Sequence, residues 1–269
     1  MLKTRIATAA VLACLLLIVL FLLPPVAAVV VFGLVFAGGA AEWAQFGGLR
    51  GAWARAGYAI LIGALLALGW YGSADPARLT LILFAACLWW TLAFLWLTLA
   101  PGRHRPVATL LGGVAVLVPA FVAMARIQTG HGVLRGPFAV LWLLLLVFGA
   151  DIGAFFAGRR FGKLKLAPRV SPSKTWEGAL GGMLAVAAIA WCGAAVFRIP
   201  AAAAVGFGCA VGLFSIVGDL TESMFKRAAG LKDSGSLLPG HGGILDRIDS
   251  ITAAAPLYAL GLFGSRMFT

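Results

Sequence analysis

A short polar segment near the C-terminal end concentrates side chains that can do chemistry. Residues 232–249, KDSGSLLPGHGGILDRID, contain three Asp, one Lys, one Arg, one His and four Gly, in a chain that is 62% hydrophobic and 11% charged. Asp246 and Asp249 are three residues apart, so on a helix they project from the same face. Carboxylates aimed into one cavity, with phosphate oxygens and water, suit Mg²⁺. The glycines around His241 indicate a turn whose N–H groups can approach a phosphate.

The segment GDLTESMFKR, residues 218–227, carries a second group of such side chains. On a helix, Asp219, Glu222 and Ser223 share a face, and Glu222 precedes Lys226 by four residues. This spacing is typical of a surface ion pair, the interpretation that we favour for Glu222. Asp219 ends an apolar run, where an acid tends to face a bundle interior or a wet cavity. The alternative for Asp219 is a structural carboxylate at a helix end or in a buried pair.

The third group lies in DIGAFFAGRRFGKLKLAPRVSPSKTWEG, residues 151–178. Its first residue, Asp151, is again an acid after an apolar run, with the same two interpretations as Asp219. Residues 158–174 hold six Lys and Arg, which is typical of a loop that contacts lipid headgroups. The alternative is a site for a phosphate chain or a nucleotide, made by Ser171, Ser173, Lys174 and Thr175.

Long apolar segments must position these side chains. Mean hydropathy is +1.02, whereas soluble domains are only about 45–50% apolar. A helix needs about 20 apolar residues to cross a bilayer, and continuous apolar runs satisfy their backbone only as helix. We therefore expect an all-α, polytopic integral membrane protein with about nine transmembrane helices. The candidate segments are 6–23, 26–46, 58–71, 79–100, 107–124, 137–157, 178–197, 201–225 and 251–265, of which the third and the last are short. The first also resembles a cleavable signal peptide, but its length and the spans that follow favour a retained helix.

The charges indicate how the chain is oriented and divided. A net charge of +12 on a membrane protein indicates basic loops that face the cytoplasm and anionic lipid, and we expect no nucleic-acid partner. With the N-terminus inside and nine spans, 16 of the 21 basic residues fall on the cytoplasmic side, which predicts a C-terminus outside. Only Glu42 and Asp75, of nine acids, precede residue 150. This asymmetry divides the chain into N-terminal transmembrane helices, 1–136, and a C-terminal catalytic region, 137–269.

The run SMFKRAAGLKDSGSLLPGHGGILDRID, residues 223–249, resembles the signature of the phosphatidate cytidylyltransferases, or CDP-diacylglycerol synthases. Eleven fixed positions of that signature are present: Ser223, Lys226, Arg227, Lys232, Asp233, His241, Gly242, Gly243, Asp246, Arg247 and Asp249. SPSKTWEG, residues 171–178, resembles the other characteristic loop of the family.

The resemblance implies a membrane enzyme, a homodimer, that converts CTP and phosphatidate to CDP-diacylglycerol and pyrophosphate with Mg²⁺, in phospholipid biosynthesis. It implies that Asp219 and Asp246 bind the metal, and Asp249 is a further candidate ligand. The other catalytic candidates are Lys226 and Arg247. The substrate-binding candidates are Ser171, Ser173, Lys174, Thr175, Arg227, Lys232, Asp233, His241, Gly242 and Gly243. We expect the protein in the inner (plasma) membrane, with the site facing the cytoplasm, where CTP is available.

Two other functions are compatible with parts of the sequence. A CDP-alcohol phosphotransferase also uses Asp-bound metal at a membrane face, but its spaced D-G…A-R…G…D…D pattern is absent. A transporter or channel would explain the many spans and the intramembrane acids. The chain has no inverted repeat, however, and its polar residues cluster toward one face, which favours the enzyme.

Overall fold

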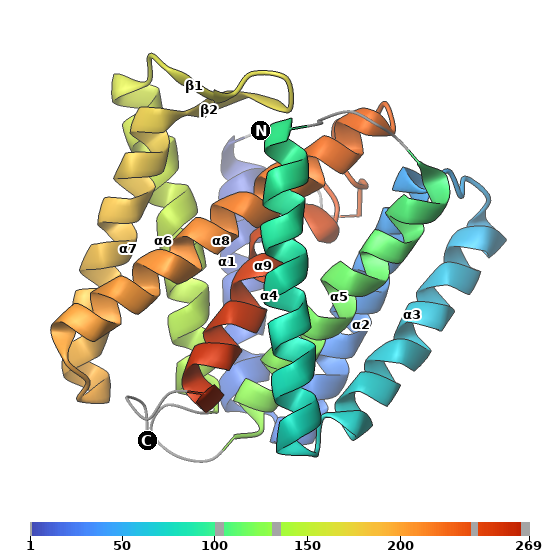
Figure 1. Cartoon of the computed structure of the whole chain (residues 1–269), viewed down its shortest axis with the longest axis horizontal. Coiled ribbons are helices and arrows are strands. Elements are labelled where there is room, and N and C mark those ends of the chain that lie inside the picture. The colour runs from blue at the N-terminus through green and yellow to red at the C-terminus, as the bar shows by residue number, and fades with distance from the viewer. Residues whose placement is uncertain (1, 100–104, 131–135, 238–241, 265–269) are drawn as a thin grey trace.

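The computed structural model describes residues 2–99, 105–130, 136–237 and 242–264, with side chains from residue 7 onward. In these ranges the chain forms nine α-helices and one two-stranded antiparallel sheet (Figure 1). The elements are α1 Leu2–Phe21, α2 Pro25–Phe46, α3 Ala52–Gly72, α4 Pro76–Leu99, α5 Pro106–Gln128, α6 Pro137–Phe161, β1 Lys165–Ala167, β2 Ser171–Thr175, α7 Trp176–Phe197, α8 Ala201–Ala228 and α9 Leu245–Gly264.

The all-helical membrane fold predicted from the apolar segments is confirmed. Each of the nine segments corresponds to a helix, and seven helices, α2 to α8, are long and apolar enough to cross a membrane. The two segments that looked short belong to longer helices, because α3 begins at Ala52 and α9 begins at Leu245, in more polar sequence. The helices run back and forth, so the α2–α3, α6–α7 and α8–α9 connections lie at one end of the bundle (Figure 1).

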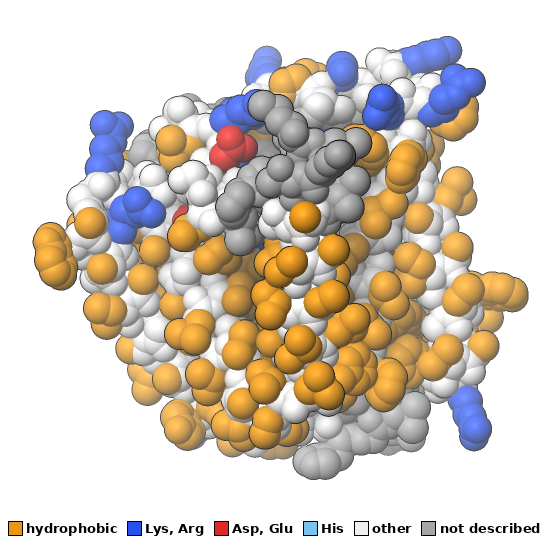
Figure 2. Space-filling model, turned by 180° about the vertical axis from the view of Figure 1, so that it is seen from behind, with side chains coloured by type: hydrophobic (Ala, Val, Ile, Leu, Met, Phe, Trp, Pro, Cys, Tyr) orange, Lys and Arg blue, Asp and Glu red, His pale blue; other side chains and the backbone are white. Residues whose placement is uncertain are grey.

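The outside of the bundle is apolar, as expected for a protein in lipid. Hydrophobic side chains cover most of the face seen in Figure 2, and Lys and Arg side chains gather toward one end. Large hydrophobic residues such as Leu34, Leu81 and Leu184 are 68%, 68% and 73% exposed. In contrast, α9 is largely buried and contacts α2, α4, α5, α6 and α8. The helix that begins with the signature acids is therefore held from several sides.

Helices α6 and α7 approach each other closely along small residues. A Cβ added at Gly182 would lie 2.6 Å from the backbone oxygen of Ala150, and one added at Gly153 would lie 2.7 Å from the backbone oxygen of Gly181. These neighbours are backbone atoms of packed helices, so they cannot move away locally. Close approach through glycine is a common way to pack transmembrane helices, and here it brings Asp151 of α6 near β2 and α7.

We expect Gly182→Ala to destabilise the protein by about 1–3 kcal/mol, the usual cost of overpacking, and to lower the melting temperature in detergent. Gly63→Ala in α3 is the matched control, since a Cβ at Gly63 has no heavy atom within 4 Å. That variant should melt at or slightly above the wild-type temperature. Equal melting temperatures for the two variants would contradict the close approach of α6 and α7.

The segment between α6 and α7 is a β-hairpin, whereas the sequence indicated only a basic loop. Lys165 pairs with Thr175 and Ala167 with Ser171. The Thr175 side chain then accepts a hydrogen bond of 3.1 Å from Gly178 N and caps the start of α7. Because the cap joins β2 directly to α7, Lys174 is held at a defined place beside α8.

Candidate active site

A cavity of about 780 Å³ lies among α6, β2, the start of α7, α8, residues 232–233 and the start of α9. Its size is that of a small-molecule site. Ten of the candidate residues line it: Ser173, Lys174, Thr175, Asp219, Lys226, Lys232, Asp233, Asp246, Arg247 and Asp249. Asp151 lines it too. Ser171, Arg227, Gly242 and Gly243 are not among the described lining residues, and His241 lies outside the residues that the structure describes.

Asp219 of α8 and Lys174 of β2 lie side by side in the wall of the cavity. The Lys174 ammonium forms an ion pair with Asp219 Oδ2, and the two side chains are 28% and 22% exposed. Ser223 Oγ donates a weaker hydrogen bond of 3.4 Å to Asp219 Oδ1. This pair links the hairpin to α8, two segments that the sequence separates by 45 residues.

Lys226 lies between two carboxylates. Its Nζ is 2.6 Å from Asp246 Oδ1 and 3.0 Å from Glu222 Oε1. The predicted pairing of Glu222 with Lys226 is confirmed, but the prediction that it lies on the surface is wrong, because the Glu222 and Lys226 side chains are only 4% and 10% exposed. Buried charges are stable only when they are paired. Lys226, Glu222 and Asp246 therefore stabilise one another in the interior, and Lys226 and Asp246 also line the cavity.

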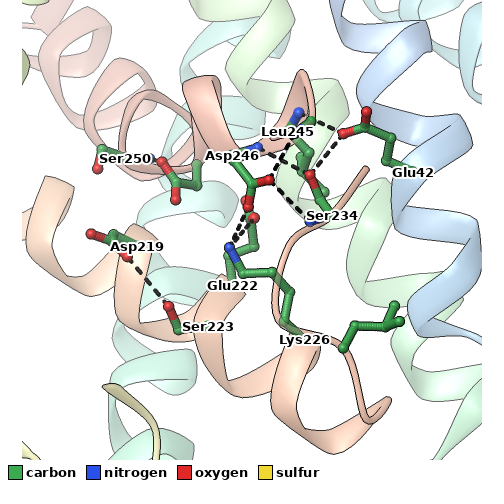
Figure 3. Close-up of polar contacts among 12 residues, drawn as sticks. Glu42, Asp219, Glu222, Ser223, Lys226, Ser234, Leu245, Asp246 and Ser250 are labelled. Atoms are coloured by element: carbon green, nitrogen blue, oxygen red, sulfur yellow. Dashed lines mark hydrogen bonds and ion pairs between the residues drawn. The ribbon is translucent and has the colours of Figure 1, made fainter. Parts of the chain in front are cut away.

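The second oxygen of Asp246 is held by the backbone. Asp246 Oδ2 accepts hydrogen bonds from Gly243 N at 2.9 Å and from Ser234 N at 3.0 Å (Figure 3). Together with the Lys226 ammonium at Asp246 Oδ1, these two N–H groups satisfy both oxygens of the carboxylate and hold it in one orientation.

Comparisons with known proteins identify the family of this chain. The Cytidylyltransferase family profile matches residues 3–263. This chain belongs to the cytidylyltransferase family. Two relatives described as "Phosphatidate cytidylyltransferase" match along nearly their whole length: the Pseudomonas aeruginosa protein is 41% identical over 98% of both chains, and the Haemophilus influenzae protein is 37% identical over 98% of this chain and 99% of its own. A third, from Brucella suis, is 50% identical over 131 residues, 47% of this chain and 46% of its own.

The carboxylates of this cytidylyltransferase suit a hard cation shared with a ligand. Asp151, Asp219, Asp246 and Asp249 all line the cavity. Within the described residues, no three His, Cys, Asp or Glu side chains stand close enough to hold an ion by themselves. Magnesium is usually held by one or two carboxylates together with phosphate oxygens and water. The donors present therefore fit Mg²⁺ that arrives with a phosphate ligand.

Two glycines of the family signature serve the loop itself. Gly242 has a φ of +80°, a backbone conformation that side chains disfavour. Gly243 is buried, and its N–H donates to Asp246, so it is occupied within the protein. Gly243 N thus binds Asp246 in this structure, and the expectation that these glycines bring N–H groups to a phosphate stays a prediction.

Sequence reasoning missed a buried acid of α2. Glu42 is 1% exposed and accepts hydrogen bonds from Ser234 Oγ, Ile244 N and Leu245 N at 2.8, 3.0 and 2.8 Å. The signal was available, because an acid in an apolar span is costly and tends to be functional. The same rule predicts a role for Asp151 and Asp219, whereas the charge distribution marks Glu42 only as one of two acids before residue 150.

Proposed function

We propose that the protein transfers the cytidylyl group of CTP to phosphatidate, giving CDP-diacylglycerol and pyrophosphate. The observation that carries the proposal is the convergence of hairpin residues and signature residues on one cavity. Family membership and the full-length relatives described as phosphatidate cytidylyltransferases support it. All described lining residues fall between 150 and 249, which supports the division into a helical part, 1–136, and a catalytic part, 137–269.

The reaction needs charge neutralisation and alignment more than it needs a base. A phosphate oxygen of phosphatidate forms a bond to the α-phosphorus of CTP, the bond from that phosphorus to the β-bridging oxygen breaks, and pyrophosphate leaves with the electron pair. The second pKa of a phosphate monoester is about 6, so the nucleophile is largely ionised at neutral pH. The main barrier is the approach of two polyanions in a partly desolvated site.

The cavity provides cations for that task. Lys174, Lys226, Lys232 and Arg247 line it, and we assign them to the phosphates of the two substrates. Lys174 and Lys226 already stand against Asp219 and Asp246, so a bound phosphate meets ammonium groups whose positions are set. We assign Ser173 and Thr175 as hydroxyl donors in the same wall. Ser171, Arg227 and the signature glycines would then act on the shape of the loops around the site, and Asp233 lines the cavity beside Lys232.

The acids are assigned to Mg²⁺. Asp219 and Asp246, with Asp249 beside them on α9, would hold the ion. When bound, Mg²⁺ neutralises CTP phosphates and stabilises the leaving pyrophosphate. The protein's own contribution is to fix the carboxylates, as the hydrogen bonds to Asp246 illustrate.

Turnover of defined substrates tests the proposal. Purified protein is incubated with labelled CTP, phosphatidate and Mg²⁺, and the products are separated. CDP-diacylglycerol and pyrophosphate in equal amounts are the expected result. Turnover of CDP-diacylglycerol with an alcohol in place of CTP would support a phosphotransferase, and no turnover of either lipid would contradict an enzymatic role.

We further propose that the chain spans the inner membrane as a homodimer with the cavity facing the cytoplasm. Two observations support this orientation. Successive helices of the described chain alternate in direction (Figure 1), and Lys and Arg side chains gather toward one end of the bundle (Figure 2).

A reporter fused to the C-terminus is expected on the side opposite the cytoplasm. The physical reason is that the cytoplasmic side retains basic loops, which fixes the N-terminus inside and, with nine crossings, the C-terminus outside. An alkaline phosphatase fusion should be active and a fluorescent protein fusion dark. The reverse pattern would contradict the orientation.

A further inference from the structure

The buried carboxylate of Glu42 stands next to the proposed site without being part of its wall. Glu42 lies near the end of α2, and it is not among the described residues that line the cavity. Both of its oxygens are occupied: Oε1 accepts from Ile244 N, and Oε2 accepts from Ser234 Oγ and Leu245 N. These donors come from the segment that joins α8 to α9, residues 229–244, and from the first residue of α9. They follow Glu42 by roughly two hundred residues in the chain.

Ser234 connects Glu42 to Asp246. Its hydroxyl donates to Glu42 and accepts a 3.3 Å hydrogen bond from Asp246 N, while its own N–H donates to Asp246 Oδ2. Gln45, also of α2, donates to Ser234 O at 3.2 Å. Ser234 is 1% exposed. Figure 3 shows Ser234 between Glu42 on one side and Asp246 with Lys226 on the other. The serine is thus held from α2 and in turn holds the aspartate.

The loop between α8 and α9 packs closely against the Glu42 carboxylate. A Cβ added at Gly235 would lie 2.3 Å from Glu42 Oε1, and one added at Gly243 would lie 2.3 Å from Glu42 Oε2. The two glycines let the loop close around the carboxylate. Leu245 and Ile244 donate their free N–H groups there because they lie at the start of α9, where helical partners are missing. Glu42 therefore accepts hydrogen bonds at the N-terminal end of α9, as a capping carboxylate would.

We infer that Glu42 is a positioning residue: through Ser234 it holds Asp246 in place at the cavity. The inference rests on the proposed function, because it assigns Glu42 to the reaction in which Asp246 takes part. Glu42 touches neither substrate nor metal in this role. Its effect reaches the chemistry by setting the position of a carboxylate that does, as partners of metal ligands commonly do.

Glu42→Gln is the sharpest variant. The amide has nearly the same shape, but in either orientation its NH₂ faces an N–H group, so three donors cannot all be accepted. We expect kcat/KM to fall about 10- to 100-fold, the range for lost partners of metal ligands. We also expect the half-saturating Mg²⁺ concentration to rise and the gain in melting temperature on adding CTP and Mg²⁺ to shrink. Asp75→Asn makes the same chemical change in the exposed α3–α4 turn, at the other end of the bundle, and should alter none of these.

A double-mutant cycle tests the route through Ser234. Ser234→Ala removes the hydroxyl and should lower kcat/KM in the same direction. If Glu42 acts through Ser234, the double variant should lose about as much as Glu42→Gln alone, because coupled residues are not additive. Losses that multiply, or a Glu42→Gln enzyme with wild-type kinetics and Mg²⁺ dependence, would overturn the inference.

Two outcomes separate this inference from the proposed function. A wild-type protein that does not convert CTP and phosphatidate contradicts the function itself, whatever the variants do. If Glu42→Gln does not accumulate as folded protein, Ser234→Ala alone carries the test, since it leaves Glu42 two backbone donors. Wild-type turnover and Mg²⁺ dependence in Ser234→Ala would then overturn the inference.

Discussion

Asp246→Asn is expected to abolish CDP-diacylglycerol formation while the protein remains folded in the membrane. The amide is neutral, and it cannot accept hydrogen bonds from Ser234 N, Gly243 N and Lys226 with two equivalent oxygens. Loss of one charged ligand of a catalytic metal removes several kcal/mol of transition-state stabilisation, which corresponds to a rate reduction of about 10²–10³-fold or more. The rate is measured with labelled CTP and phosphatidate across a range of Mg²⁺ concentrations.

Two comparisons make that experiment decisive. Asp75→Asn should retain wild-type activity, because its carboxylate only caps an exposed turn with Ala77 N and pairs with Arg78. Wild-type turnover by Asp246→Asn at high Mg²⁺ would remove Asp246 from direct contact with the ion. An elution profile in detergent like that of wild type shows that the protein has folded.

Lys226→Met is expected to have the largest effect on stability. Lys226 neutralises both Glu222 and Asp246 in the interior, and the exposed fractions of the three side chains are 10%, 4% and 8%. Methionine fills a similar volume but leaves two carboxylates without a cation. Breaking a buried pair in this way typically costs about 3–5 kcal/mol, and activity should be lost with it. Unfolding is followed by temperature or by titration with a denaturing detergent.

The control for that variant is Lys165→Met, a change of the exposed residue of strand β1, which should unfold like wild type. Adding Glu222→Gln to Lys226→Met should restore part of the lost stability, because it removes one of the uncompensated charges. A Lys226→Met protein as stable as wild type would contradict the buried ion-pair cluster.

Much of the fold followed from simple patterns. Continuous apolar runs predicted the helices because a backbone in lipid must satisfy itself, and family membership predicted from the signature is confirmed. The spacing of Asp246 and Asp249 predicted a shared helix face, and both line the cavity. Local periodicity is sufficient for such features, since they depend on residues within one or two turns.

What the sequence did not reveal depends on contacts between distant segments. The i,i+4 spacing predicted that Glu222 and Lys226 pair, but not that α9 covers them and adds Asp246. The hairpin was missed because its strands are three and five residues long and include Pro172. Glu42 was missed because nothing near it in the sequence indicates its partners. They follow α2 in the chain only after six other helices, α3 to α8.

The bonds of Glu42 also bear on how the protein is made. Leu245 N donates to Glu42 across a separation of 203 residues. At a synthesis rate of about 5–20 residues per second, roughly 10–40 seconds pass between the emergence of α2 and that of its partners. During this interval α2 enters the bilayer with an acid that lacks its hydrogen-bond donors. The hydrogen bonds of Glu42 can form only after Ser234, Ile244 and Leu245 have been synthesised. A chain truncated before Ser234 would lack all three donors and would keep a buried carboxylate without hydrogen-bond partners, whereas a chain truncated just before α9 would lack only the donor at Leu245.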